Sequence, residues 1–350
     1  MKIYCAISFH GFGHLAQSAP ILNALHGRGA LSDLVIHSNG PLSVIKPWFS
    51  AAFEHIQQPT DLGTPMINAI QVDKEETYRQ FLHQHQNKSA AVNGMASLIA
   101  KHQPDLVLSN NSYLVSRAAS QLGIPSYHFC SLNWADNFLA FCEGKPQVNE
   151  IYQALCDDYN QAEAFFRLPP HMPMPGFNNL VDIGPVCRTG TKRNLQQHFK
   201  HKKRKTYILV SLGGMPYPID FASWPKSDDL FFINGGARSE HLPHMDDTGL
   251  SHIDLITSCD VIITKPGYGL YMEAACCGTP ILYLARKDWP EEPPLIEWEN
   301  QYIYCQEISN QQLQTGDFLQ EIERALNSQP KALATPSGIN QIVEHLLKHQ

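Results

Sequence analysis

The sequence predicts an α/β protein built from two doubly wound parallel sheets, one in each half of the chain. Three observations support this prediction. Short apolar runs alternate with segments of helical spacing in both halves, and the pattern starts again after a polar, basic stretch. The length of 350 residues also fits two domains of ordinary size.

The first half contains four apolar runs that read as strands with helices between them. A parallel sheet follows from this rhythm, because parallel neighbours need a crossover helix. We expect residues 75–102 to form one long helix. The remaining expected elements are strands 2–8, 34–38, 104–109 and 124–130, and helices 14–25 and 113–122, and the half ends at the apolar residues 180–186.

The second half repeats the alternation after residues 188–205, a stretch without apolar periodicity that we interpret as a linker. Residues 215–228 contain three prolines and are expected to form a loop. The expected strands are 206–214, 229–236, 260–264 and 280–285, and the expected helices are 267–277 and 338–348. The predicted organisation is a first domain 1–187, the linker, a second domain 206–332, and a helical segment 333–350 for which a return to the first domain is left open.

Composition excludes several classes of function. The net charge of −7 argues against a nucleic-acid partner. Nine cysteines, an odd number with no C-x-x-C pair, favour reduced thiols and a cytoplasmic location. We expect no signal peptide and no transmembrane segment, because no long apolar run is present. Seventeen histidines without an H-E-x-x-H or clustered Cys/His pattern give no reason to expect a metal.

The first expected strand runs into Gly11-x-Gly13-x-x-Ala16, a spacing typical of dinucleotide-binding turns. Such sites also need an acidic residue about 20 positions further on, and the second strand ends in residues 37–40, His-Ser-Asn-Gly. The glycines are equally explained by a tight strand-to-helix turn. This turn also carries His10 and His14, which a dinucleotide site does not need.

The second informative stretch is 264–280, TKPGYGLYMEAACCGTP. A strand ends here, Gly267 and Gly269 let a ligand approach the backbone, and the helix that follows offers N–H groups and the positive end of its dipole. Lys265 adds a cation, so a diphosphate would fit. Glu273 lies one turn further and could accept hydrogen bonds from ribose hydroxyls. Taken alone, Glu273 could also be an acidic residue in an early helical turn that only stabilises the positive end of the helix dipole.

Residues 260–286 resemble the donor segment of the GT-B glycosyltransferases, in which a glycine turn is followed by Glu, Gly and Pro, here Gly267, Glu273, Gly278 and Pro280. The segment is also similar to the glycosyltransferase-like amino-terminal region of plant L-arabinokinases. Four further stretches of the chain resemble the same family in the same order. They are GFGHLAQSAPILNAL, PDLVLSNN with the later SLNWADNF, LVDIGPVCR, and SLGG.

The resemblance implies a GT-B fold, with two Rossmann-like domains facing each other across a cleft. The second domain would bind a nucleotide sugar, UDP-sugar by resemblance, as a substrate and without a cofactor. The nucleobase of the donor would lie near Asn234, Gly235 and Gly236, and the loop formed by the ARKDWPEE segment would contact the sugar. The implied donor-binding residues are Gly213, Gly214, Asn234, Gly235, Gly236, Lys265, Gly267, Tyr268, Gly269, Glu273, Arg286, Asp288, Glu291 and Glu292.

The resemblance assigns His14 as the general base, with His10 as the alternate and Gly13, Asn133 and Trp134 on the acceptor side. An imidazole suits proton removal from a hydroxyl at neutral pH. Many inverting relatives pair this histidine with an aspartate, whereas Asn110 stands at that position here. An amide can orient an imidazole, but it does not compensate the charge of an imidazolium.

The sequence therefore predicts an inverting, metal-independent glycosyltransferase. Retaining relatives often carry two glutamates separated by seven residues; the first would fall at position 265, which is Lys265. Two alternatives remain open, a nucleotide-sugar 2-epimerase of the same fold and a nucleotide-sugar-binding protein without catalysis. The acceptor, the sugar and the oligomeric state are not indicated.

Overall fold

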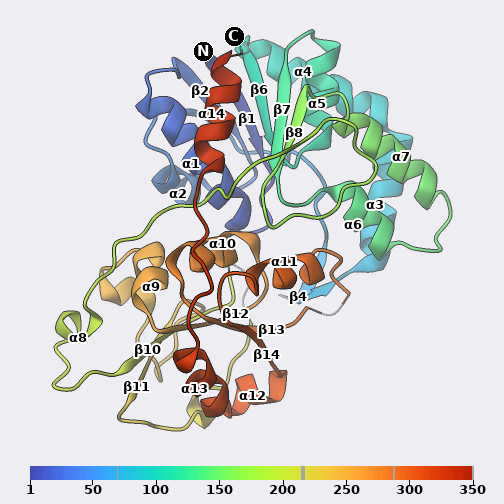
Figure 1. Ribbon diagram of the computed structural model, residues 1–350. Helices are drawn as coiled ribbons and strands as arrows, with labels where there is room; N and C mark the ends of the chain where they lie inside the picture. The colour runs from blue at the N-terminus through green and yellow to red at the C-terminus, as the bar shows by residue number, and fades with distance from the viewer. Residues whose placement is uncertain (69, 214–216, 287, 349–350) are drawn as a thin grey trace.

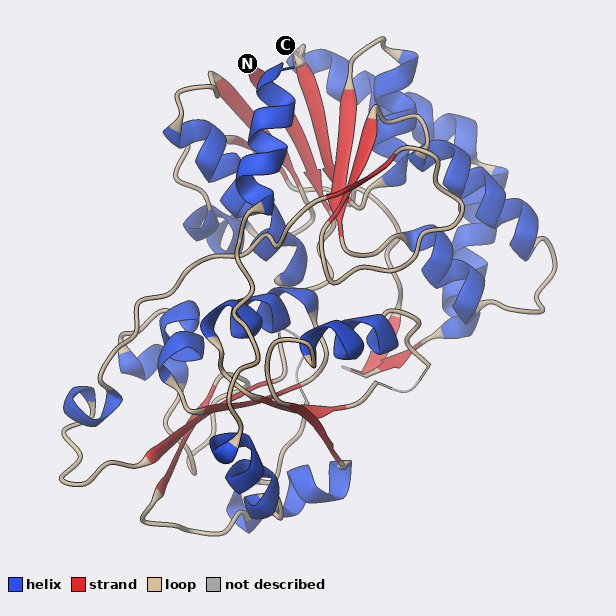
Figure 2. Ribbon diagram, in the orientation of Figure 1, coloured by secondary structure: helices blue, strands red, loops and turns tan. Residues whose placement is uncertain are grey.

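The computed structural model describes residues 1–68, 70–213, 217–286 and 288–348. The chain forms two α/β domains, each built on a parallel sheet with helices on both faces (Figure 1 and Figure 2). This is the predicted fold class. Among the described residues no helix is both long and apolar enough to cross a membrane.

The first sheet has seven strands in the order β3-β2-β1-β6-β7-β8-β9, and every pair of neighbours is parallel. The central strand β1 lies between β2 and β6, so its carboxyl end meets that of β6. The strands are β1 (Lys2–Ile7), β2 (Asp33–His37), β3 (Glu54–Ile56), β6 (Leu106–Asn110), β7 (Ser126–Cys130), β8 (Ala164–Arg167) and β9 (Leu180–Asp182).

Alternate residues of β1 face the two layers of helices. Ile3, Cys5 and Ile7 pack in one apolar cluster with α1 and α14, whereas Tyr4 and Ala6 pack in the other with α3 to α7. These helices are α1 (Gly13–Gly27), α14 (Gly338–Lys348), α3 (Lys74–Gln86), α4 (Lys88–His102), α5 (Tyr113–Gln121), α6 (Trp134–Phe141) and α7 (Val148–Tyr159). The shorter α2 (Leu42–Ile45), η1 (Lys46–Trp48) and the hairpin β4 (Met66–Asn68)–β5 (Gln71–Val72) complete this domain.

The second sheet has the order β11-β10-β12-β13-β14, again with every neighbour parallel. One face packs against α9 to α11 and the other against α12 and α13. Its elements are β10 (Thr206–Ser211), β11 (Leu230–Asn234), α9 (His252–Ser258), β12 (Val261–Thr264), α10 (Tyr268–Cys277), β13 (Ile281–Leu284), α11 (Glu292–Glu299), β14 (Cys305–Ile308), α12 (Asn310–Thr315) and α13 (Leu319–Asn327).

Helices α10 and α11 lie between the two sheets, and α10 contacts α1 of the first domain (Figure 1). At Gly269 a Cβ atom would lie 3.1 Å from the Cβ of Ala16 and 3.7 Å from the Cα of Gly13. The beginnings of α10 and α1 therefore touch. A second contact joins the rings of Phe141 and Trp289, whose centroids are 5.4 Å apart.

The chain crosses between the domains twice, and the two crossings meet. After α13 it returns to the first domain, where α14 lies against α1 (Figure 1). The amide of Gly338, the first residue of α14, donates to the carbonyl of Pro185 at 3.0 Å. A Cβ atom on Gly338 would lie 2.0 Å from the carbonyl oxygen of Gly184.

We expect Gly338→Ala to destabilise the first domain by about 1–3 kcal/mol, because the added methyl group would force two backbone segments apart. Chemical denaturation measures the effect. Gly94→Ala is the matched control. Gly94 is an exposed residue of α4 with open space around it, so alanine there should stabilise by about 0.5–1 kcal/mol. Equal stability of the two variants would contradict the close crossing.

Several local predictions were wrong. Residues 75–102 form two helices, because Asn87 ends α3; its backbone N–H and side-chain amide both donate to the carbonyl of His83. The expected loop 215–228, of which residues 215 and 216 lie outside the described residues, contains η2 (Phe221–Ser223); the expected linker includes a short helix, α8 (Leu195–His198), which does not contradict a linker. The strands expected at 206–214 and 229–236 end earlier, at Ser211 and Asn234.

Candidate functional site

The turn between β1 and α1 presents two histidines at the carboxyl edge of the first sheet. Gly11 has a φ of +108°, a conformation that favours glycine, and α1 begins at Gly13. A dinucleotide site would need an acidic residue at the end of β2, and none stands there; Asp61, whose carboxylate lies 3.6 Å from His10 of this turn, belongs to a different loop. The site is therefore built around imidazoles.

His14 is buried and bonded to Asn110. Its Nδ1 lies 2.5 Å from the amide oxygen of Asn110, whose amide nitrogen donates to Gln17 and to the carbonyl of Phe129. These bonds fix the Asn110 amide, so Nδ1 of His14 carries the proton and Nε2 presents its lone pair. Burial lowers the pKa of His14 to about 4, so the ring is neutral at pH 7.

His10 and His14 both lie beside the ring of Trp134, and His10 faces a carboxylate. The ring centroids of His10 and Trp134 are 5.2 Å apart, and those of His14 and Trp134 are 6.1 Å apart. The Nε2 of His10 lies 3.6 Å from Oδ1 of Asp61, a carboxylate that the sequence did not single out. The structure thus brings together both predicted histidines, Asn110 and Trp134.

Asn133, predicted on the acceptor side, has a local role. Its amide oxygen accepts from the backbone N–H of Asp136 at 2.8 Å and caps α6. The cap fixes the start of the helix that carries Trp134. Asn133 is fully buried, so its side chain holds this helix in position under the histidines.

The glycine turns of the second domain that are predicted to bind the donor lie next to each other. The pairing of Ser211 with Thr264 brings the ends of β10 and β12 together, and a Cβ atom on Gly213 would lie 3.8 Å from Nζ of Lys265. Gly267 is the N-cap of α10, so the amino end of this helix opens toward the same turn. Gly214 lies outside the described residues.

Lys265 shares its surroundings with the charged segment 286–292. Burial first, and then the charge of Arg286, lower the pKa of Lys265 to about 8, while Glu291 and Glu292 act in the opposite direction. The backbone N–H of Arg286 donates to Glu292 at 2.9 Å, and its guanidinium lies 4.2 Å from the ring centre of Trp289. Two cations and two carboxylates therefore gather beside α10.

Arg286, Glu291 and Glu292 of this segment are buried, although a solvated turn was also open from the sequence. Only 2 % of Glu291 and 7 % of Arg286 are exposed, whereas Asp288 is exposed and pairs with Lys74 of the first domain at 3.5 Å. Several buried polar atoms have no hydrogen-bond partner among the described residues. They are Oε1 of Glu291, Nε and Nη2 of Arg286, Nε1 of Trp289 and the hydroxyl of Tyr268.

Glu273 is held by an arginine from the segment between the domains. The Nε and Nη2 atoms of Arg188 lie 2.8 and 2.7 Å from Oε1 of Glu273, and 3 % of the glutamate side chain is exposed. The guanidinium also lies 4.2 Å from the ring centre of Trp48 in the first domain. Burial raises the pKa of Glu273, and Arg188 opposes this shift.

The residues expected near the nucleobase of the donor form a closed turn after β11. The Asn234 amide donates to the carbonyl of Ala237 at 2.6 Å and accepts from the N–H of Gly236 at 2.9 Å. The N–H of Gly235 donates to the carbonyl of Val210. Asn234 is buried and its amide is already bonded within the turn, so the turn shapes this edge of the sheet.

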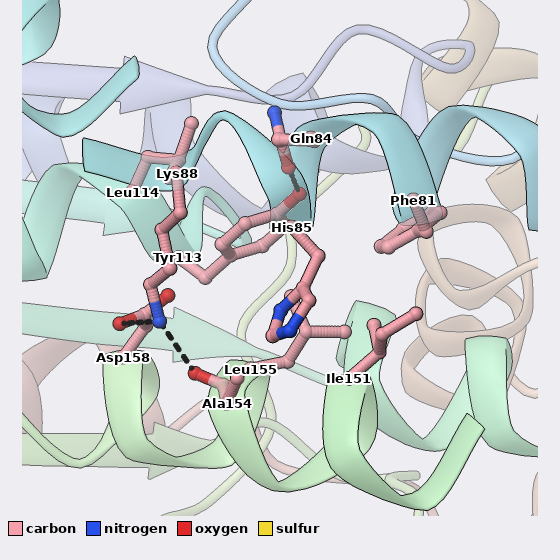
Figure 3. Close-up of a pocket in the computed structure, with 10 residues that line it drawn as sticks. All are labelled: Phe81, Gln84, His85, Lys88, Tyr113, Leu114, Ile151, Ala154, Leu155 and Asp158. Carbon is pink, nitrogen blue, oxygen red and sulfur yellow. Dashed lines mark hydrogen bonds and ion pairs between the residues drawn. The ribbon is translucent and has the colours of Figure 1, made fainter. Parts of the chain in front are cut away.

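Two cavities lie away from the histidines. The one in Figure 3, of about 10 Å³, lies between α3, α4, α5 and α7; there Lys88 contacts Asp158 at 2.8 Å, and no predicted site residue lines it. It has room for about one water molecule. The other, of about 300 Å³, lies between the domains and is lined by the β4–β5 hairpin, Phe141 and Asp288.

The two sheets, their order and the meeting of their glycine turns define the GT-B fold. This fold is shared with solved sugar-transferring and sugar-epimerising enzymes. The calicheamicin glycosyltransferase CalG4 superposes with a TM-score of 0.67 at 14 % identity, covering 99 % of this chain and 97 % of that one. The UDP-GlcNAc 2-epimerase from Neisseria meningitidis, bound to UDP-GlcNAc, has a TM-score of 0.58 at 13 % identity, covering 99 % and 100 %.

In sequence, the chain is similar to L-arabinokinase of Arabidopsis thaliana, with 23 % identity over 362 residues. The match covers 98 % of this chain but 34 % of the relative, so the chain spans about a third of that protein. No protein-family profile matches the chain. The similarity agrees with the L-arabinokinase resemblance noted in the sequence.

Proposed function

We propose that this protein transfers a sugar from a nucleotide-sugar donor, a UDP-sugar by analogy with its structural neighbours, to an acceptor hydroxyl with inversion. One observation carries the proposal. Gly269 of the donor-side helix touches Gly13 and Ala16 of the histidine-bearing helix. A donor bound at α10 would therefore have its reacting carbon close to the imidazoles.

The chemistry of the donor side supports diphosphate binding. A leaving nucleoside diphosphate gains negative charge as its bond to the sugar breaks. The amino end of α10, the Gly213 turn and the ammonium group of Lys265 offer N–H donors and positive charge to it. The buried polar atoms of Arg286, Glu291 and Tyr268 that have no hydrogen-bond partner in the described residues would contact the sugar, while Arg286 keeps its ion pair with Glu292 at 3.6 Å. Glu273 would bind ribose only after exchanging its bond to Arg188.

On the acceptor side, a base takes the proton of the attacking hydroxyl. His14, the residue indicated by the resemblance, and His10, its alternate, are the candidates. The neutral His14 ring presents Nε2 as an acceptor, with Asn110 holding its other nitrogen. The alternative reaction, 2-epimerisation, is favoured by the likeness to the Neisseria enzyme and needs no acceptor.

We expect Lys265→Met to weaken binding of UDP at least tenfold at pH 7, because the diphosphate would lose its cation. In the unaltered protein the affinity should also fall as the pH rises through about 8, where Lys265 loses its proton; the variant should lack this fall. Isothermal titration calorimetry with UDP between pH 6.5 and 9.5 measures both effects. Lys226→Met, at an exposed lysine of the same domain, is the control.

Incubation with UDP-glucose and UDP-GlcNAc then separates the candidate functions. Slow release of UDP, with water as the acceptor, supports transfer. Conversion of UDP-GlcNAc to its 2-epimer supports the epimerase, and binding of UDP without any turnover supports a binding protein. Absence of binding by every nucleoside diphosphate would contradict all three.

A further inference from the structure

A second imidazole–acid pair lies beside His14, formed by His10 and the carboxylate of Asp61. We infer that His10 is the general base of the proposed transfer. Asp61 is then the residue that positions the His10 ring and stabilises its protonated form. The inference rests on the proposed function. It supplies the carboxylate that is missing at Asn110, from a loop that has no counterpart in the motifs of the sequence.

Asp61 is held in one orientation by hydroxyl groups. Its Oδ2 accepts from the hydroxyl of Ser8 at the end of β1 and from that of Thr60 at 3.3 Å, while Oδ1 faces His10. The loop itself is tied to the start of α5, because Ser112 donates to the carbonyl of Thr60 at 2.6 Å. The carboxylate is thus fixed from two sides.

The carboxylate is buried without a permanent cation. Its side chain is 2 % exposed, and within the described ranges the one cationic partner in ion-pair distance is His10. A buried carboxylate gains most from a positive charge next to it, because little solvent is present to screen the pair. Asp61 therefore favours the imidazolium that His10 would become on taking a proton.

His10 is the more accessible of the two histidines. Its side chain is 34 % exposed, whereas His14 is 7 % exposed. The ring lies directly over Gly63, where a Cβ atom would fall 1.6 Å from Nε2, and beside Trp134. With Nε2 turned toward Asp61, Nδ1 is the nitrogen that remains for a substrate hydroxyl.

The reaction balances with this assignment. The acceptor oxygen forms a bond to the anomeric carbon, and the bond from that carbon to the diphosphate oxygen breaks. The nucleoside diphosphate leaves with the electron pair, and the hydroxyl proton moves to Nδ1 of His10. The imidazolium then faces the Asp61 carboxylate at 3.6 Å, a separation that is long for a hydrogen bond but typical of sites without substrate.

His14 is less suited to this step. Its partner Asn110 is uncharged, and burial first and then the charge of His10 lower the pKa of His14, whereas Asp61, which is not in ion-pair distance of this ring, acts in the opposite direction. His10 is faced by Asp61 and by His14. Protonation of the pair is thus directed to the ring beside the carboxylate, and His14 would instead hold the acceptor hydroxyl through Nε2.

The test compares Asp61→Asn, His10→Gln and His14→Gln in the turnover of UDP-glucose and UDP-GlcNAc. We expect the first two to lower kcat roughly a hundredfold with an unchanged KM, and the third to lower it less than tenfold. In Asp61→Asn the acidic limb of the pH profile of kcat should move to lower pH, which a purely structural loss would not produce. A threefold or smaller loss of kcat in Asp61→Asn would overturn the inference. A hundredfold loss in His14→Gln with His10→Gln active would also overturn it.

A control and a second readout keep this test separate from the proposed function. Asp158→Asn removes another buried aspartate of the same domain, which is bonded to Lys88 (Figure 3) and also to Arg117. It should lower stability but leave kcat per folded molecule unchanged. Should the unaltered protein turn over no UDP-sugar, the proposed function fails, and the dyad is then tested by nitrogen-15 NMR of the histidine rings. In the unaltered protein the proton of neutral His10 should lie on Nε2, which faces Asp61, and this preference should be lost in Asp61→Asn but kept in Asp158→Asn; a preference unchanged in Asp61→Asn would overturn the dyad.

Discussion

Arg188→Ala is expected to lower the free energy of unfolding by about 3–5 kcal/mol, since it leaves the buried carboxylate of Glu273 without its cation. Arg188 makes two short contacts with this carboxylate and lies over Trp48 of the other domain, so the loss should also loosen the contact between domains. Urea denaturation followed by circular dichroism measures the effect.

The stability lost in Arg188→Ala should depend on pH, and the direction of this dependence follows from the pKa of Glu273. Without Arg188 the pKa of Glu273, already raised by burial, rises further. A carboxyl group with a raised pKa in the folded state stabilises fully at low pH, and this stability is lost as the pH rises through the raised value. The deficit of Arg188→Ala should therefore grow from pH 5 to pH 8.

Two further variants check the cause. Arg188→Ala combined with Glu273→Gln should recover most of the loss, because no charge is then left buried. Arg193→Ala breaks a more exposed contact with Asp254 at 3.7 Å and should cost less than about 1 kcal/mol. Equal losses in Arg188→Ala and Arg193→Ala would show that the buried pair contributes nothing special.

The second large effect is a gain of stability. Glu299, the last residue of α11, is fully buried, and both of its carboxyl oxygens have no hydrogen-bond partner within the described chain. The described titratable groups that interact with it are themselves acids, the thiols of Cys276 and Cys305 and the phenol of Tyr271. Burial therefore raises the pKa of Glu299 well above its ordinary value.

We expect Glu299→Gln to make the protein more stable than the unaltered protein at pH 8 and about equally stable at pH 4. Above the ordinary glutamate pKa of about 4.3, unfolding releases a proton, so the unaltered protein loses about 1.4 kcal/mol per pH unit until the folded-state pKa is reached. Glutamine does not titrate and removes this slope. Thermal and urea denaturation between pH 4 and 9 measure it.

Glu297→Gln, an exposed position of the same helix, is the control and should leave the pH dependence as it is. If the stability of Glu299→Gln and that of the unaltered protein changed with pH in the same way, Glu299 would not be buried as an isolated acid. The Arg188→Ala and Glu299→Gln experiments thus examine two buried carboxylates of the second domain. One removes the partner of a buried acid, and the other removes a buried acid that has no partner.

The arrangement of the two sheets could be predicted because it depends on local patterns. Apolar runs such as Lys2–Ile7 and Val261–Thr264 are buried on both faces, and the glycine turns that follow them stand at the carboxyl edge of each sheet. The break at Asn87 escaped prediction, since residues 83–89 are polar but contain no glycine or proline to mark the end of a helix, and Asn87 ends α3 through its bonds to the carbonyl of His83.

The pairings that complete the candidate site could not be predicted, because they join loops far apart in the sequence. Asp61 reaches Ser8 only because β1 and β3 enter the same sheet, separated by β2. Arg188 and Glu273 meet because the chain passes α10 as it leaves the first domain. No spacing rule connects such residues, and Asp61 lies in a loop without a motif.

The return of α14 to α1 has a consequence for the order of folding during synthesis. The apolar face that α1 and β1 present to α14 is completed by Ile342, Val343 and Leu346, and these residues are made after the whole second sheet. From residue 183 to residue 337 the ribosome therefore elongates a chain whose first domain still lacks its closing helix. The second domain, continuous in sequence, can finish folding before the domain that was begun first.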